Sequence, residues 1–358
     1  MSKIVFTADI HFGVPGKLND ILFACNTIRD YCIKSKIDTI IVLGDLFHDR
    51  RSLGVDILAA ACKFFESTLE VGQQWITFPG NHDMFLRHSW DINSLIPFER
   101  LITVINNVSI LQLDDKRFWV LPFIQFEKSY MKVIQKMLQK VEKGDKLLTH
   151  IGVRGATLNT CFLLKDWSHV TFDDSPFERI YTGHFHSRQQ IGNVYYPGSP
   201  IPFKFDEGDV SHGFIVYDTD TNDHKFVDIW KTAKILYPNE IPPPQFVTIL
   251  SDDIDNISAD HVNNNMVRVA LNREYTNNEK KNISDKLKSM GSRIVRWMNV
   301  IQKEQTVQKA PSTTKDLFRS WIQNDKKTIK HLDEELLISI NKEVTNEGDE
   351  LYIVEESE

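Results

Sequence analysis

Eight polar residues in the first half of the chain each follow a short apolar run. The runs read IVFTADIH, IIVLGDLF, ITFPGNHD, LLTHIG and IYTGHFH. The polar residues near their ends are Asp9, His11, Asp45, Asn81, His82, His150, His184 and His186. Strand ends that bring carboxylate, amide and imidazole groups to one place can hold divalent metals. The pattern therefore constrains both the fold and the chemistry.

Short β-type runs alternate with helical patterns as far as about residue 237. Thr39–Leu43 is rich in β-branched residues and predicts a strand, whereas residues 17–34 have the period of an amphipathic helix. This alternation predicts a layered α/β fold whose second half is more antiparallel. Because sites in α/β sheets gather beyond the carboxyl ends of the strands, we expect the eight residues to share one site.

A proline-rich run, Pro238–Gln245, predicts a domain boundary, because its three consecutive prolines cannot continue a helix or a central strand. Beyond it, Met266–Leu271, a helix around 278–290 and Arg293–Asn299 predict a small β-α-β cap. The expected units are a main domain, a cap, a pair of C-terminal helices and an acidic tail, over residues 1–237, 245–301, 311–345 and 346–358.

The net charge of −7 conceals a basic region. Residues 271–330 carry 14 Lys or Arg against 6 Asp or Glu, whereas residues 331–358 carry 10 acids and one Lys. A basic region suits nucleic acid, although a solvated helical face has the same composition. The four cysteines are scattered, the N-terminus has no signal-peptide pattern, and no apolar run reaches the roughly 20 residues of a membrane span. We therefore expect a cytoplasmic protein with no membrane contact.

The eight residues combine oxygen and imidazole ligands, a set suited to manganese, iron or zinc. Two such ions can activate water and hold phosphate oxygens. The expected ligands are Asp9, His11 and His186 for one ion, and Asn81, His150 and His184 for the other. Asp45 is expected to bridge the two, since a carboxylate has two oxygens. A lone histidine is more often structural than a ligand, but that explanation does not account for five motifs in this order.

The order DxH, GD, GNH(D/E), H and GHxH resembles the calcineurin-like metallophosphoesterase superfamily over about residues 1–237. The resemblance implies a four-layer α-β-β-α sandwich. It also implies that His82, the non-ligand histidine of GNHD, is the catalytic acid that protonates the leaving oxygen. A positioned imidazole can give up a proton at neutral pH, which agrees with that role.

Within this superfamily, the runs GDLFHDRR, GNHD and GHFHS…YYPGSP are similar to the SbcD-type DNA double-strand-break repair nucleases. The protein phosphatase branch has GDxVDRG and GNHE instead, and here His48 and Asp83 stand in place of its acids, which disfavours a phosphatase. The resemblance implies that His48 helps to seat a DNA strand, a surface-loop histidine being the alternative. Arg50 and Arg51 could hold phosphates, although exposed loop arginines are common.

The resemblance extends to the accessory regions. It implies a DNA-binding cap, whose candidate phosphate contacts are Lys280, Lys281, Lys286, Lys288, Arg293 and Arg296. It implies that the C-terminal helices grip the coiled coil of an SbcC-like, SMC-type ATPase, self-packing being the alternative. The apolar side chains expected to bind that partner include Leu317, Phe318, Trp321, Leu332 and Leu336. A homodimer formed through helices flanking the site is also implied.

Together these features predict a DNA nuclease that uses two divalent metal ions, Mn²⁺ in preference to Mg²⁺. The resemblance implies 3′–5′ exonuclease activity on double-stranded ends and endonuclease activity on single strands, with the ATPase, in recombination and double-strand-break repair. One rival is a nucleotide or cyclic-nucleotide phosphodiesterase on the same metal core. Another is a non-catalytic DNA-tethering protein, which the complete ligand set and His82 disfavour.

Overall fold

The structure, a computed structural model, describes residues 3–86, 89–159, 162–163, 170–173, 175–208 and 210–299. The predicted C-terminal helices and acidic tail lie outside the described residues. So do the predicted partner-binding residues Leu317, Phe318, Trp321, Leu332 and Leu336. Among the described helices, none is long and apolar enough to cross a membrane.

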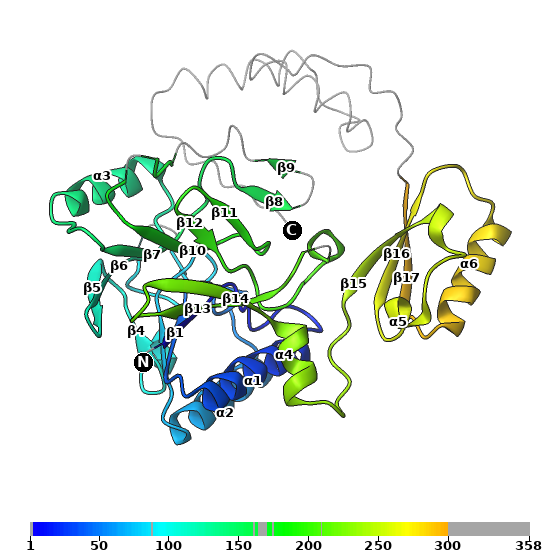
Figure 1. Ribbon diagram of the computed structural model, residues 1–358, viewed down its shortest axis with the longest axis horizontal. Helices are drawn as coiled ribbons and strands as arrows, with labels where there is room; N and C mark the ends of the chain where they lie inside the picture. The colour runs from blue at the N-terminus through cyan, green and yellow to red at the C-terminus, as the bar shows by residue number, and fades with distance from the viewer. Residues whose placement is uncertain are drawn as a thin grey trace, which may run out of the picture. The chain divides into compact units, whose positions relative to one another are not determined.

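The first sheet has six strands in the order β14-β13-β1-β2-β3-β4. Its strands are β1 Lys3–Thr7, β2 Thr39–Val42, β3 Gln74–Thr77, β4 Thr103–Val104, β13 Gly213–Asp218 and β14 Asp223–Asp228. Strands β1 to β4 run parallel, and β13 returns antiparallel beside β1. This sheet packs against the helices α1 Leu18–Ser35, α2 Val55–Glu70 and α4 Ile229–Leu236 (Figure 1).

The second sheet also has six strands, in the order β11-β12-β10-β7-β6-β5. Its strands are β5 Ser109–Leu113, β6 Lys116–Leu121, β7 Lys146–His150, β10 Arg179–Gly183, β11 Gln189–Ile191 and β12 Val194–Tyr196. Its helix is α3 Glu127–Leu138, and a separate two-stranded ribbon is formed by β8 Thr157–Asn159 and β9 Phe162–Leu163. Strands β6, β7, β10 and β12 run parallel, so His150 and His184 emerge at the same sheet edge.

Side-chain alternation along the strands stacks these elements in four layers. In β1, Val5 joins the cluster shared with α1 and α2, whereas Ile4 and Phe6 join the cluster between the two sheets. On the second sheet, Trp119 and Leu147 pack with α3 in a third cluster. Both faces of each central strand are therefore buried, as continuous apolar runs require. The predicted four-layer α/β sandwich is confirmed.

We expect Phe6→Ala to destabilise the fold by about 3–5 kcal/mol, the usual cost of emptying a buried aromatic site. Phe6 is fully buried between the sheets, where its ring stacks on Tyr181 at 4.4 Å and meets Phe118 edge-on at 6.0 Å. Urea unfolding followed by circular dichroism measures the change. Phe126→Ala, at a 55% exposed position, is the control and should shift stability by less than about 0.5 kcal/mol.

The cap is a three-stranded parallel sheet with a helix on one face. Its elements are β15 Phe246–Leu250, α5 Ala259–Val262, β16 Met266–Leu271, α6 Asn277–Ser289 and β17 Ile294–Asn299. A capping box between Thr276 and Glu279 starts α6, and Gly291, at φ +93°, follows its end. The predicted β-α-β unit is present, and β15 adds a strand that the sequence pattern does not predict.

The two faces of the cap sheet differ. Val267 and Val269 pack with Leu287 of α6, whereas the alternate residue Arg268 points to the opposite face. Arg268 is in register with Thr248 and Arg296, so these three side chains share that second face. It is also the face that meets the main domain, since Arg268 Nη1 donates to Asp206 Oδ1 at 2.8 Å.

Candidate metal centre

Sharp turns at the strand ends bring the candidate ligands together. Asp9, His11, Asp45 and His184 lie just after β1, β2 and β10, and all four have positive φ, between 51° and 97°. A non-glycine residue in this region costs on the order of 1 kcal/mol or more, and such residues gather at functional sites. The backbone strain thus marks the same edge of the sheets that the sequence pattern indicates.

The first expected ligand set is brought together in the structure. Asp9, His11 and His186 offer ligand atoms that all lie within 4.8 Å of one another. The Nε2 atoms of His11 and His186 are 3.0 Å apart, although 175 positions separate them in the chain. Asp9 is fully buried and its carboxylate accepts the amide hydrogen of His184. These three side chains form one candidate metal site.

The second expected set converges in the same way. Asn81 Oδ1 lies 3.0 Å from His150 Nε2 and 2.9 Å from His184 Nδ1. The orientation of the His150 ring is fixed, because its Nδ1–H donates to the carbonyl of Leu43 at 2.8 Å. A histidine held in this way presents Nε2 as its ligand atom.

Asp45 lies between the two sets. Its Oδ2 is 3.8 Å from His11 Nε2 in the first set and 3.2 Å from His150 Nε2 in the second. Its Oδ1 accepts the amide hydrogen of His82 at 2.8 Å, which fixes the carboxylate. A Cβ at position 80 would collide with Asp45, so Gly80 of the GNHD motif is required for this approach. This placement supports the expectation that Asp45 bridges two ions.

The ionisation of the imidazoles suits a cation site. Burial lowers the pKa of His11, and burial together with His150 lowers the pKa of His184 to about 3. Both rings are therefore neutral near pH 7, the form that binds metal. Burial alone would lower the pKa of His186, but its hydrogen bond to Glu207 and the nearby carboxylates raise it. Its Nδ1–H donates to Glu207, so Nε2 is the atom that would bind an ion in place of a proton.

Asp45 provides negative charge between the two ligand sets, whereas burial raises the pKa of Asp9 to about 6. Burial alone would raise the pKa of Asp45, but the charge and hydrogen bond of His150 hold it well below its usual range. Burial disfavours the charged form of His150, yet Asp45 outweighs this and raises the pKa of His150 to about 9. A divalent cation would occupy the position of that proton. The donor set present therefore fits two metal ions.

His82 and His48 lie beside the first ligand set. Their rings stack at 5.5 Å and 12°, and the ring of His11 is 4.9 Å from that of His82 and 5.3 Å from that of His48. His82 Nδ1–H donates to the carbonyl of His48 at 2.7 Å. This bond leaves Nε2 of His82 as the nitrogen for proton transfer.

Two acids that support the site were assigned no role from the sequence. Asp83 is buried and accepts the amide hydrogens of Phe47 and Gly80, both at 3.0 Å, which ties the loop after β2 to the loop after β3. Burial and the nearby Asp45 raise its pKa to about 7. The sequence could have revealed Asp83, because it is the last residue of the GNHD motif. Glu207, the acceptor for His186, has no motif that could reveal it.

The predicted DNA contacts are not gathered on one face. Lys280 and Lys281 belong to α6, where Lys280 lies 6.0 Å from the ring of Trp297. Arg296 points to the opposite face of the cap sheet, on the side of Arg268. Arg293 is exposed and precedes β17. Arg50, in the loop after β2, is half-buried.

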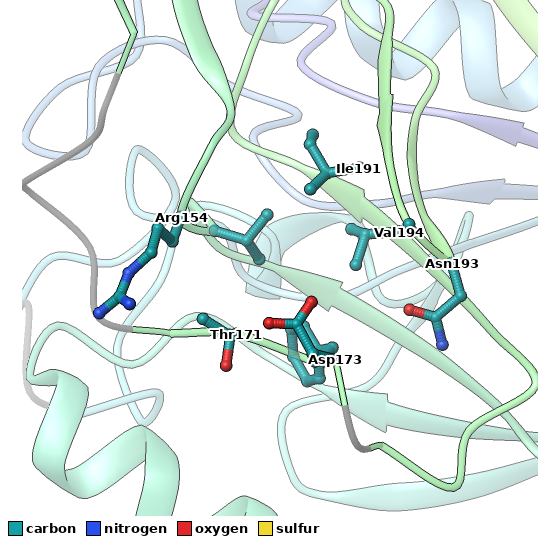
Figure 2. Close-up of a pocket in the computed structure, with 9 residues that line it drawn as sticks. Arg154, Thr171, Asp173, Ile191, Asn193 and Val194 are labelled. Atoms are coloured by element: carbon teal, nitrogen blue, oxygen red, sulfur yellow. The ribbon is translucent and has the colours of Figure 1, made fainter.

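A cavity of about 310 Å³ lies apart from the ligand sets and is lined by none of them. Val153, Phe172 and Val194 give it apolar walls. Figure 2 shows Arg154 and Asn193 on opposite sides of the cavity, with Asp173 between them. The metal chemistry is thus separate from this cavity.

Comparison with known proteins agrees with this geometry. Residues 2–188, more than half of the chain, match the calcineurin-like phosphoesterases, and the chain belongs to that family. These phosphoesterases use a dimetal site, and the structure has candidate ligands for one.

Three relatives are similar at low identity. Exonuclease subunit 1 of enterobacteria phage T4 is 25% identical over 239 residues, which cover 63% of this chain and 67% of the relative. The SbcD component of the SbcCD nuclease of Staphylococcus epidermidis is 24% identical, over 62% of this chain and 67% of the relative. The putative phosphoesterase 244L of invertebrate iridescent virus 6 is 23% identical, over 75% of this chain and 92% of the relative.

Proposed function

We propose that the protein is a dimetal-dependent DNA nuclease, a 3′–5′ exonuclease on double-stranded ends and an endonuclease on single strands. The observation that carries the proposal is the convergence of two ligand sets on Asp45, with His82 beside them. DNA as the substrate is supported by the two relatives that are named as parts of an exonuclease and a nuclease.

In this proposal, two bound ions supply an activated water and neutralise the phosphate charge. Asp9, His11 and His186 would hold one ion, Asn81, His150 and His184 would hold the other, and Asp45 would contribute to both. His82 donates the proton on Nε2 to the leaving 3′ oxygen. His48, whose carbonyl fixes the His82 ring, positions the strand that carries that oxygen.

The proposal includes partners. Residues 1–237 form the nuclease domain, residues 245–301 a DNA-binding cap, and residues 311–345 helices that bind an SMC-type ATPase in the cytoplasm of a bacterium or of a phage-infected host. The naming of two relatives as components of larger nucleases supports a partnered nuclease. A homodimer is supported by exposed apolar side chains, Phe85, Leu86 and Ile92, soon after His82.

We expect the purified protein to degrade end-labelled linear duplex DNA in Mn²⁺ and to lose this activity in a chelator, since the proposed mechanism relies on the two ions to neutralise the phosphate. The measurement is nucleotide release on a sequencing gel, with excess Mn²⁺ added back after chelation. Cyclic nucleotides assayed in parallel provide the comparison. Hydrolysis of cyclic nucleotides without cleavage of DNA would establish the rival phosphodiesterase.

A further inference from the structure

The short helical turn η2, Phe205–Glu207, reaches the metal centre through its last residue. Glu207 is 1% exposed, and its Oε1 accepts the Nδ1 hydrogen of His186 at 2.9 Å. Its Oε2 accepts the amide hydrogen of Phe203 at 2.8 Å, so the carboxylate is fixed at both oxygens. Phe203 also packs edge-on against the ring of His186, with centroids 5.3 Å apart.

Glu207 is the hydrogen-bond partner of the ring nitrogen of His186 that faces away from the metal centre, and it differs from what lies at that nitrogen in His150 and His11. Nδ1 of His150 donates to the backbone carbonyl of Leu43, which no side-chain substitution removes. Nδ1 of His11 is buried without a hydrogen-bond partner among the described residues. Glu207 is thus a side-chain carboxylate that fixes the tautomer and orientation of a ligand histidine, a role that raises the basicity of the ligand atom.

The preceding residues of the same turn contact the cap. The ring of Phe205 meets that of Phe246 in β15 at 4.8 Å, and Asp206 accepts from Arg268 in β16 at 2.8 Å. The guanidinium of Arg268 also lies over the Phe205 ring, 5.2 Å from its centroid. At the next position, Gly208 is so close to Phe246 that a Cβ would collide with its carbonyl oxygen. Three consecutive residues therefore join the cap sheet to the ligand His186.

We infer that η2 links the cap to the metal centre, with Glu207 as the positioning residue of His186. This inference rests on the proposed metal site and adds to it a route by which the position of the cap sets the affinity for one of the two ions. A short turn that is hydrogen-bonded to both the cap and His186 can transmit a small displacement of the cap strands to the His186 ring.

Calorimetric titration of the full-length protein with Mn²⁺ tests the positioning role. We expect Glu207→Ala to weaken binding of one ion by about 10- to 100-fold and to leave the other within about threefold. Glu207→Gln keeps an acceptor oxygen and should restore part of the loss. Glu207→Ala also removes the acceptor of the Phe203 amide, so its melting temperature in chelator should fall slightly below that of the wild type. Unchanged affinity in Glu207→Ala, or a parallel loss of both ions with a much lower melting temperature, would overturn the positioning role.

The link to the cap is tested with a matched pair of arginine variants. Arg268→Ala removes the ion pair to Asp206, whereas Arg273→Ala removes a pair to Glu279 that lies wholly within the cap. We expect Arg268→Ala to weaken the same ion as Glu207→Ala by about 2- to 30-fold, and Arg273→Ala to have no such effect. Equal affinities in the two arginine variants would overturn the link. A wild-type protein that fails to bind two ions would instead overturn the proposed function.

Discussion

Replacing Asp45 with asparagine is expected to lower phosphodiester hydrolysis by about 10²- to 10³-fold, the scale on which loss of an electrostatic catalytic group acts. Asp45 Oδ2 faces both ligand sets, so its charge contributes to holding each ion. An amide of the same shape keeps the Oδ1 contact with the His82 amide but loses the negative charge between the ions. The variant should therefore fold normally and bind fewer than two Mn²⁺ per chain.

Two readouts check this expectation. Hydrolysis of a generic phosphodiester in Mn²⁺ gives the rate, and equilibrium dialysis gives the number of ions bound. Asp38→Asn is the matched control, because Asp38 is an exposed carboxylate at the opposite end of β2. Two tightly bound ions and near-normal hydrolysis in Asp45→Asn would show that the carboxylate does not bridge.

Replacing His82 with asparagine is expected to lower DNA cleavage by about 10²- to 10⁴-fold, the range for loss of a general acid. Two bound ions should be retained, since His82 lies beside the ligand sets without being one of the seven expected ligands. A thymidine nitrophenyl phosphate has a leaving group that needs no proton. Its hydrolysis should therefore fall far less, by under about tenfold.

The ratio of the two rates identifies the role of His82. A loss confined to DNA indicates proton donation to the leaving oxygen, whereas an equal loss on both substrates indicates phosphate binding. His261→Asn, at an exposed histidine of the cap, serves as the control and should leave both rates unchanged. Full DNA cleavage by His82→Asn would contradict the assignment of the acid.

The sequence predicts the central strands well because their apolar composition matches their buried position in the sheets. The predicted strands over Thr39–Leu43 and Met266–Leu271 are found at Thr39–Val42 and Met266–Leu271. Strand β2 is apolar on both faces, so its run is continuous and easy to recognise. In β16, Val267 and Val269 mark the face under α6, although Arg268 interrupts the run. Polar residues come directly after these apolar runs in the sequence, and this is why the candidate ligands could be predicted as one set.

The elements that the sequence leaves out differ in the strength of their local patterns. Strand β14 reads DHKFVD, a largely polar edge strand whose pairing with β13 is a tertiary event. Helix α3 carries a clear amphipathic pattern that could have been predicted, with Tyr130, Ile134 and Met137 buried on one side and Lys128, Lys132 and Lys136 aligned on another. Glu207 could not have been predicted, because it meets His186 only when 21 positions of loop and strand fold back.

The left-handed turns at Asp9, His11, Asp45 and His184 have one further consequence. The packed sheets hold these turns, since Ala8, next to Asp9, and Leu43, two residues before Asp45, belong to the core between the sheets. We therefore expect the packing of the sheets to set the positions of the candidate ligands. We accordingly expect the protein to keep its fold in chelator, in contrast to small domains that unfold when their metal is removed.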